Sequence, residues 1–159
     1  MPTLVVGCGQ FGAPPHNHAA MGHTTMDVNA GVQPNIVGNI EATNSPLVTN
    51  PAYRGAFDLV VLEHVPTFGT RDVSRNVLDN CTRALAPGGE LIIMTAWSAR
   101  SKFDHMKTLL RTYGYTYRET DPDTNHGIDL SNKLGFDLGD FDARWVLRAR
   151  KVRTAESPI

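Results

Sequence analysis

The chain has 159 residues, of which 41% are hydrophobic and 19% are charged, and its formal net charge is −1. This composition predicts one folded domain over residues 1–153 with a short tail over residues 154–159, and it excludes a disordered chain. No apolar run approaches the ~18 residues of a membrane-spanning helix, and the near-neutral charge gives no general attraction to nucleic acid or anionic lipid. The two cysteines, Cys8 and Cys81, form no CxxC pair, and no basic segment of a secretory signal precedes the first apolar residues. We therefore expect free thiols in a reducing, cytoplasmic setting.

Short β-branched or continuously apolar segments predict the strands. Strands that are apolar on both faces belong in a parallel sheet that helices cover. A later segment, residues 144–150, alternates apolar and basic side chains, as in a last strand with one wetter face. We expect its arginines to protect a sheet edge from aggregation. The other predicted strands are residues 3–7, 23–28, 35–40, 56–65, 90–96 and 115–119.

Two longer segments have apolar residues at helical spacing. The first predicts a helix that Thr70 caps and that the Pro-Gly-Gly run at residues 87–89 ends, and the second covers residues 101–114. A short helix over residues 15–22 connects the first two strands, and residues 44–54 hold one or two further turns. Strands that alternate with helices predict a doubly wound α/β sheet, whose ligand lies across the carboxyl ends of the strands.

A glycine-rich turn follows the first predicted strand. Gly7, Gly9 and Gly12 have the G-x-G-x-x-G spacing of a dinucleotide-binding turn, and Asp27 ends the second predicted strand. A carboxylate at that position accepts hydrogen bonds from both hydroxyls of a ribose. These residues alone suit NAD and S-adenosylmethionine about equally.

The residues after the glycines separate these two ligands. A diphosphate is bound by backbone N–H groups at the start of a helix, but Pro14 and Pro15 have no N–H. No lysine or arginine precedes Arg54, so no fixed cation compensates. A nucleoside that carries methionine in place of a diphosphate needs neither these N–H groups nor a fixed cation. Its sulfonium group is itself repelled by cations. The sequence therefore favours S-adenosylmethionine, with an NAD-linked enzyme as the alternative.

Five segments, in this order and spacing, resemble the class I S-adenosylmethionine-dependent methyltransferases. They are VVGCGQFG, MDVN, IVGNIEA, FDLVVLEHV and RALAPGGELIIMT, and they extend over about residues 3–95. The resemblance implies a Rossmann-like sheet, mostly parallel with an antiparallel last strand and helices on both faces, in a minimal version without the N-terminal helices of that family. It implies methyl transfer to an unidentified acceptor, which we expect to be a small molecule. The N/D-PP-Y/F segment of enzymes that methylate nucleic-acid bases is replaced by EHVP.

The resemblance also implies roles for individual residues. The glycine turn would bring the cofactor close to the backbone, Asp27 would bind the ribose, and Asn39 would accept a hydrogen bond from the adenine amine. Glu63 would contact the methionyl ammonium, and His64 would act as a general base beside the substrate. As alternatives, Asp27 and Asn39 are turn residues, Glu63 accepts loop amides, and His64 is a half-buried histidine without a catalytic role. The expected cofactor-binding residues are Gly7, Cys8, Gly9, Asp27, Val28, Asn39, Ile40 and Glu63, and the expected catalytic residues are His64 and Glu63.

One departure from the family pattern keeps a second hypothesis open. The acid that commonly stands two residues before the first glycine is replaced by Val5. A degenerate homologue that works through protein contacts without catalysis is therefore an alternative to an enzyme. A second copy of the chain completing the site is a further possibility. His16, His18 and His23 could suggest a zinc site, but we expect no metal, because no Cys partner beyond Cys8 is suitably spaced and the rings of His16 and His18 on a short helix point apart.

Overall fold

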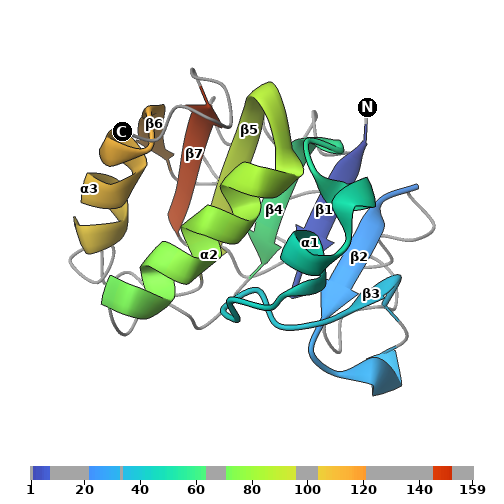
Figure 1. Ribbon diagram of the computed structural model, residues 1–159. Coiled ribbons are helices and arrows are strands. Elements are labelled where there is room, and N and C mark those ends of the chain that lie inside the picture. Colours follow the sequence, from blue (N-terminus) through green and yellow to red (C-terminus); the bar gives the residue numbers. More distant parts are fainter. Residues whose placement is uncertain are drawn as a thin grey trace.

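The computed structural model describes residues 2–7, 22–32, 34–63, 71–95, 104–120 and 145–151. Within them, one seven-stranded sheet has the order β3-β2-β1-β4-β5-β7-β6 (Figure 1). The expected strands are all present, although several are shorter or longer than predicted. They are β1 (Thr3–Val6), β2 (Thr24–Asp27), β3 (Ile36–Val37), β4 (Phe57–Glu63), β5 (Leu85–Thr95), β6 (Tyr115–Thr120) and β7 (Trp145–Lys151).

The strand directions match those of a doubly wound sheet. β1 pairs in parallel with both β2 and β4, and parallel pairing continues to β3 on one side and β5 on the other. β7 is inserted between β5 and β6 and is antiparallel to both. Six strands therefore run one way and the last one runs against them, which confirms the predicted fold class and the antiparallel last strand.

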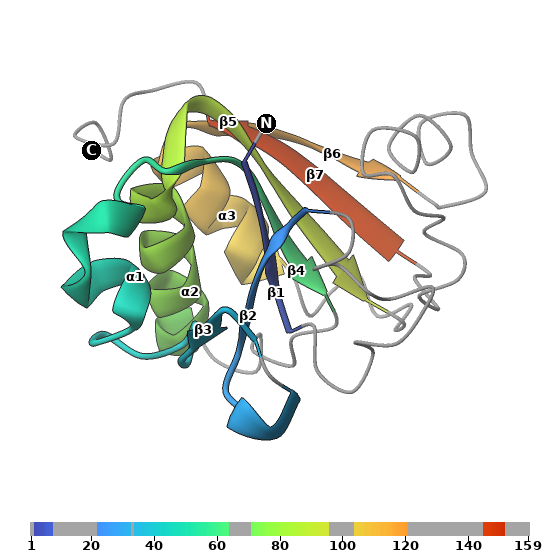
Figure 2. The ribbon, with the colours of Figure 1, turned by 90° about the vertical axis from the view of Figure 1, so that its right-hand side faces the viewer.

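The described α-helices lie on one side of the sheet (Figure 2). They are α1 (Pro46–Thr49), α2 (Arg71–Ala84) and α3 (Asp104–Thr112). Two 3₁₀ turns are also present, η2 (Ala30–Val32) between β2 and β3 and η3 (Pro51–Tyr53) between α1 and β4. The short elements α1 and η3 confirm the turns predicted over residues 44–54. None of the described helices has the length and apolarity that a bilayer crossing requires. The helix predicted over residues 15–22, and Thr70 as a cap, lie outside the described residues.

The central strands are buried on both faces. On the helix side, Leu4 and Val60 are paired and belong to the main hydrophobic core. On the other side, Val5 is paired with Val61, which is paired with Ile92, and all three are completely buried. This double burial explains why the strands read as continuous apolar runs, and it is the pattern expected of a parallel sheet.

Helix α2 ends earlier than the Pro-Gly-Gly run predicts. Its last residue is Ala84, and Leu85 already pairs with Phe57 in the sheet. The buried ammonium of Lys151, on β7, donates to the carbonyl oxygens of Thr82 and Leu85, each at 2.8 Å. These bonds satisfy helix-terminal acceptors that would otherwise lack donors. The predicted boundary at residues 87–89 is wrong, because a side chain from the far end of the sequence stabilises the earlier one.

The third strand is also shorter than predicted, since β3 has only two residues instead of six. A Cβ on Gly38 would lie 2.5 Å from the Cδ of Pro46, the first residue of α1. The chain turns next at Asn39, whose side-chain oxygen accepts the N–H of Glu41. The strand therefore ends where the backbone must pass close to α1.

The arginines of the last strand do not protect an edge. β7 lies inside the sheet, and β6 is the edge strand. Arg148 and Arg150 both contact the carboxylate of Glu90 on the neighbouring β5, at distances of 2.9–3.2 Å. The predicted alternation is confirmed, because Leu147 and Ala149 are buried on the opposite face. The function expected of the arginines is wrong, and both contact a buried acid on the neighbouring strand.

The free thiol of Cys81 lies on the buried side of α2. Complete burial raises its pKa to about 12, so the thiol stays protonated and unreactive at neutral pH. We expect iodoacetamide at about pH 8 to leave Cys81 unmodified in the folded chain and to alkylate it in urea. Mass spectrometry of the peptide that contains Cys81 measures this, and rapid native alkylation would contradict the burial.

Candidate functional site

The carboxyl ends of β1, β2 and β4 form the candidate site. Val6 is paired with Met26 on one side and with Leu62 on the other, so the following residue, Gly7, stands level with Asp27 and Glu63. Adjacent strands are ~4.8 Å apart, which places the backbones of Asp27 and Glu63 about 10 Å apart with the glycine turn between them. Asp27 and Glu63, both predicted to contact the cofactor, therefore lie on either side of Gly7, a third predicted contact.

Gly7 has the backbone conformation that only glycine adopts easily. Its φ is 82°, in the left-handed region. Its N–H donates to the carbonyl of Met26 at 2.9 Å, which continues the pairing of β1 with β2 for one more residue. The other predicted turn residues, Cys8 and Gly9, lie outside the described residues.

Asp27 ends β2 with a largely buried side chain. Asp27 is 8% exposed, and its Oδ1 accepts a hydrogen bond from the N–H of Asn29 at 2.9 Å. This bond is the one that a strand-terminal turn residue makes. A carboxylate has about four acceptor positions, so the turn bond is compatible with hydroxyl donors from a ribose. Asp27 lies level with Gly7, its ribose-binding role stays a prediction, and its burial would strengthen such hydrogen bonds.

Two valines give the site an apolar surface. Val28 is 65% exposed and Val37 is 52% exposed, and they are the exposed large hydrophobic residues among those that the structure describes. Val37 is paired with Asp27 across β2 and β3, and Val28 follows Asp27 directly. An exposed valine beside a carboxylate is suited to contact an apolar part of a ligand whose hydroxyl groups the carboxylate binds. Val37 was not predicted, because the sequence does not show which strand β2 pairs with.

The two residues predicted to lie near the adenine, Asn39 and Ile40, have different surroundings in the structure. Asn39 is exposed on the loop after β3, and its side-chain oxygen accepts the N–H of Glu41 at 2.9 Å, as a turn residue does. Ile40 is 3% exposed, and its side chain belongs to the hydrophobic core. Any contact of Ile40 with a ligand would therefore come from its backbone.

The structure describes only part of the predicted catalytic residues. Glu63 is the last residue of β4, where its backbone pairs with Met94 of β5. The structure does not describe the side chain of Glu63, and His64 lies outside the described residues. Among the residues that are described, no group of His, Cys, Asp and Glu side chains could bind a metal ion.

One residue that fixes a loop of the candidate site was not predicted from the sequence. Asn80, on α2, is 2% exposed, and its Nδ2 donates to the carbonyl oxygens of Ile40 and Ala42 at 2.7 and 2.9 Å. It thereby fixes the loop after β3 that carries Asn39. The only signal in the sequence is a polar residue within the apolar stripe of α2, between Leu78 and Cys81.

No protein-family model matches the chain, and no curated protein matches it significantly. Solved structures match its fold at low identity. For the CurJ carbon methyltransferase the TM-score is 0.62 at 13% identity, over 96% of this chain and 49% of that one, so the chain spans about half of that structure. For a SAM dependent methyltransferase from Archaeoglobus fulgidus the TM-score is 0.60 at 13% identity, over 94% and 86% of the two chains. For the cyclase SpnF it is 0.54 at 15% identity, over 94% and 74%. The chain therefore has the fold of the class I S-adenosylmethionine-dependent methyltransferases.

Proposed function

We propose that the chain binds S-adenosylmethionine across the ends of β2, β1 and β4 and transfers its methyl group to a small-molecule acceptor. The observation that supports this most is the position of Asp27, a largely buried carboxylate level with the left-handed Gly7 and beside exposed valines. The matched structures named as methyltransferases agree with it. One matched structure is named as a cyclase, so the reaction is proposed from the residues and not from the fold alone.

The residues present fit the ligand in three respects. The carboxylate of Asp27 can accept both ribose hydroxyls, and the two exposed valines can contact the adenine ring. The glycine turn allows the ligand to approach the backbone, as Gly7 has no Cβ. No lysine or arginine precedes Arg54 in the sequence, which disfavours a diphosphate and leaves a sulfonium without a repelling charge.

When bound, S-adenosylmethionine supplies an electrophilic methyl group that an in-line attack removes from sulfur. Such a displacement depends mainly on proximity and orientation. We assign Asp27 and the turn at Gly7 to hold the nucleoside, and Glu63 to hold the methionyl ammonium. His64 is proposed to lie beside the acceptor and to take its proton where the acceptor needs deprotonation.

Calorimetric titration of the full chain separates the candidate ligands. We expect heat with S-adenosylmethionine and with S-adenosylhomocysteine, and none with NAD. The physical reason is that Pro14 and Pro15 offer no N–H groups to a diphosphate. Heat with NAD alone would contradict the proposal and favour an NAD-linked enzyme.

A second function, binding without catalysis, is favoured by Val5. This residue occupies the position where the family commonly has an acid, and its side chain is completely buried in β1. It cannot accept a hydrogen bond from the turn or from the methionyl ammonium. Binding of S-adenosylhomocysteine with no consumption of S-adenosylmethionine in the presence of acceptor mixtures would indicate this function.

A further inference from the structure

The loop after β3, residues 38–42, is bonded to the candidate site where it begins. The N–H of Gly38 donates to the carbonyl oxygen of Asp27 at 3.0 Å, and Val37, the residue before it, is paired with Asp27. Adjacent strands are only ~4.8 Å apart. A base attached to a ribose at Asp27 would therefore lie beside this loop.

The hydrogen bonds inside the loop give it the shape of a turn. The side-chain oxygen of Asn39 accepts the N–H of Glu41 at 2.9 Å, and the carbonyl oxygen of Asn39 accepts the N–H of Ala42 at 3.2 Å. Such bonds link residues two or three apart in the sequence. They determine the form of the turn, but they do not attach its far end to another element of the fold.

Asn80, on α2, attaches that far end. Its side chain is buried, and its Nδ2 donates to the carbonyl oxygens of Ile40 and Ala42 at 2.7 and 2.9 Å. The carbonyl of Ile40 accepts no other hydrogen bond within the described part of the chain. Buried hydrogen bonds of this kind face little competition from water. One amide therefore fixes the position of the loop relative to α2.

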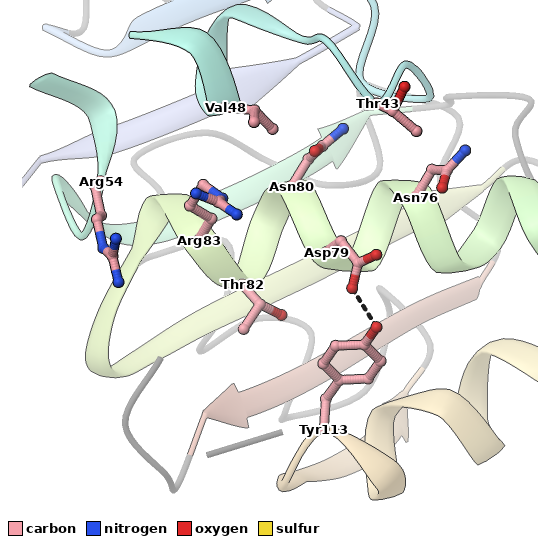
Figure 3. A pocket seen from close by; sticks show the side chains of 9 residues that line it. All are labelled: Thr43, Val48, Arg54, Asn76, Asp79, Asn80, Thr82, Arg83 and Tyr113. Carbon is pink, nitrogen blue, oxygen red and sulfur yellow. Dashed lines mark hydrogen bonds between the residues drawn. The ribbon is translucent and has the colours of Figure 1, made fainter. Parts of the chain in front are cut away.

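A second asparagine on the same helix makes no such bonds. Asn76 lies one turn before Asn80, and both side chains extend from α2 toward the segment that carries Thr43 (Figure 3). There they line a pocket of about 380 Å³. The half-buried side chain of Asn76 forms no hydrogen bond with any residue that the structure describes. Asn76 is therefore a matched control for the attachment of the loop.

We propose that Asn80 is a positioning residue that sets the preference of the site for adenine over hypoxanthine. This inference rests on the proposed function, since it concerns the base of the same cofactor. Oδ1 of Asn39 keeps a free acceptor position beside its bond to Glu41. By fixing the loop, Asn80 holds this oxygen where the adenine amine would donate to it. Hypoxanthine has a carbonyl oxygen in place of the amine, and a fixed loop cannot turn its own acceptor away from that oxygen.

The test is calorimetric titration of the full chain with S-adenosylhomocysteine and with its deaminated analogue, S-inosylhomocysteine. We expect the unchanged chain to bind the adenine ligand at least ~10-fold more tightly, because two acceptors face each other in the other complex. Asn80→Leu has a similarly branched side chain without a donor, and it should reduce this preference to about threefold or less. Asn76→Leu should leave the preference unchanged.

Circular dichroism shows whether each variant is folded. If Asn80→Leu does not fold, Asn80→Ala takes its place with the same expected result, because its smaller side chain leaves room for water at the two carbonyl oxygens.

The preference is the decisive quantity, because a general loss of stability would weaken the binding of both ligands equally. An unchanged preference in the Asn80 variant would overturn the inference, even if both ligands bound more weakly. An equal loss of preference in Asn76→Leu would also overturn it, as would the absence of any preference in the unchanged chain. If the unchanged chain did not bind S-adenosylhomocysteine at all, the proposed function itself would be contradicted.

Discussion

Replacing Asp27 with alanine is expected to weaken the binding of S-adenosylhomocysteine at least ~10-fold, equivalent to about 1.4 kcal/mol. The carboxylate is largely buried at the end of β2, so hydrogen bonds to ribose hydroxyls form there with little competition from water. Truncation removes the acceptor and leaves both hydroxyls without partners. Isothermal titration calorimetry measures the change.

Two further variants show whether the effect belongs to this carboxylate. Asp27→Asn retains one acceptor oxygen and should lose less affinity than Asp27→Ala. Asp58→Ala is the matched control, because Asp58 is an exposed aspartate at the opposite end of β4. Unchanged affinity in Asp27→Ala, with a fold intact by circular dichroism, would show that another group binds the ribose.

The largest expected effect on stability is that of Lys151→Met. The ammonium of Lys151 is completely buried and donates to two carbonyl oxygens at the end of α2. Methionine has a similar volume but no donor, so both carbonyls would be left buried without partners. We expect the free energy of unfolding to fall by roughly 2–4 kcal/mol. Urea denaturation followed by circular dichroism measures it.

Lys107→Met is the control for this change. Lys107, on α3, pairs with Glu119 on β6, and both side chains are partly exposed. A partly exposed ion pair contributes at most about 1 kcal/mol, so this variant should unfold close to the original midpoint. If Lys151→Met were as stable as Lys107→Met, the ammonium would not be what ends the helix.

The sheet could be predicted from the sequence because its signal is local. β1 and β4 contain the continuous apolar runs 4–6 and 59–62, and Val5 and Val61 show why, since each is completely buried. The antiparallel direction of β7 was implied only by the family resemblance. Periodicity identifies a strand but does not show which strand it pairs with.

The errors of prediction arose where distant residues decide the structure. The end of α2 depends on Lys151, which lies 66 residues from its partner Leu85. The end of β3 depends on the close approach of Gly38 to Pro46. The arginines of β7 were assigned to an edge because nothing in the sequence shows that β6 covers that strand.

The sequence predicted part of the candidate site and missed other residues of it. Asp27 and Gly7 were identified because Asp27 ends one strand and Gly7 follows another, and parallel strands bring their carboxyl ends to one edge. Val37 and Asn80 were not identified, since their roles depend on contacts with β2 and with the loop after β3. The binding and catalytic roles of all the predicted site residues stay predictions, and Cys8, Gly9 and His64 also lie outside the described residues.

The most direct measurement is a crystal structure of the chain grown with S-adenosylhomocysteine. The account predicts the nucleoside across the ends of β1 and β2, with both ribose hydroxyls within hydrogen-bond distance of Asp27 and the adenine against Val28 and Val37. A ribose bound elsewhere, or side chains filling that edge of the sheet so that no nucleoside fits, would contradict it.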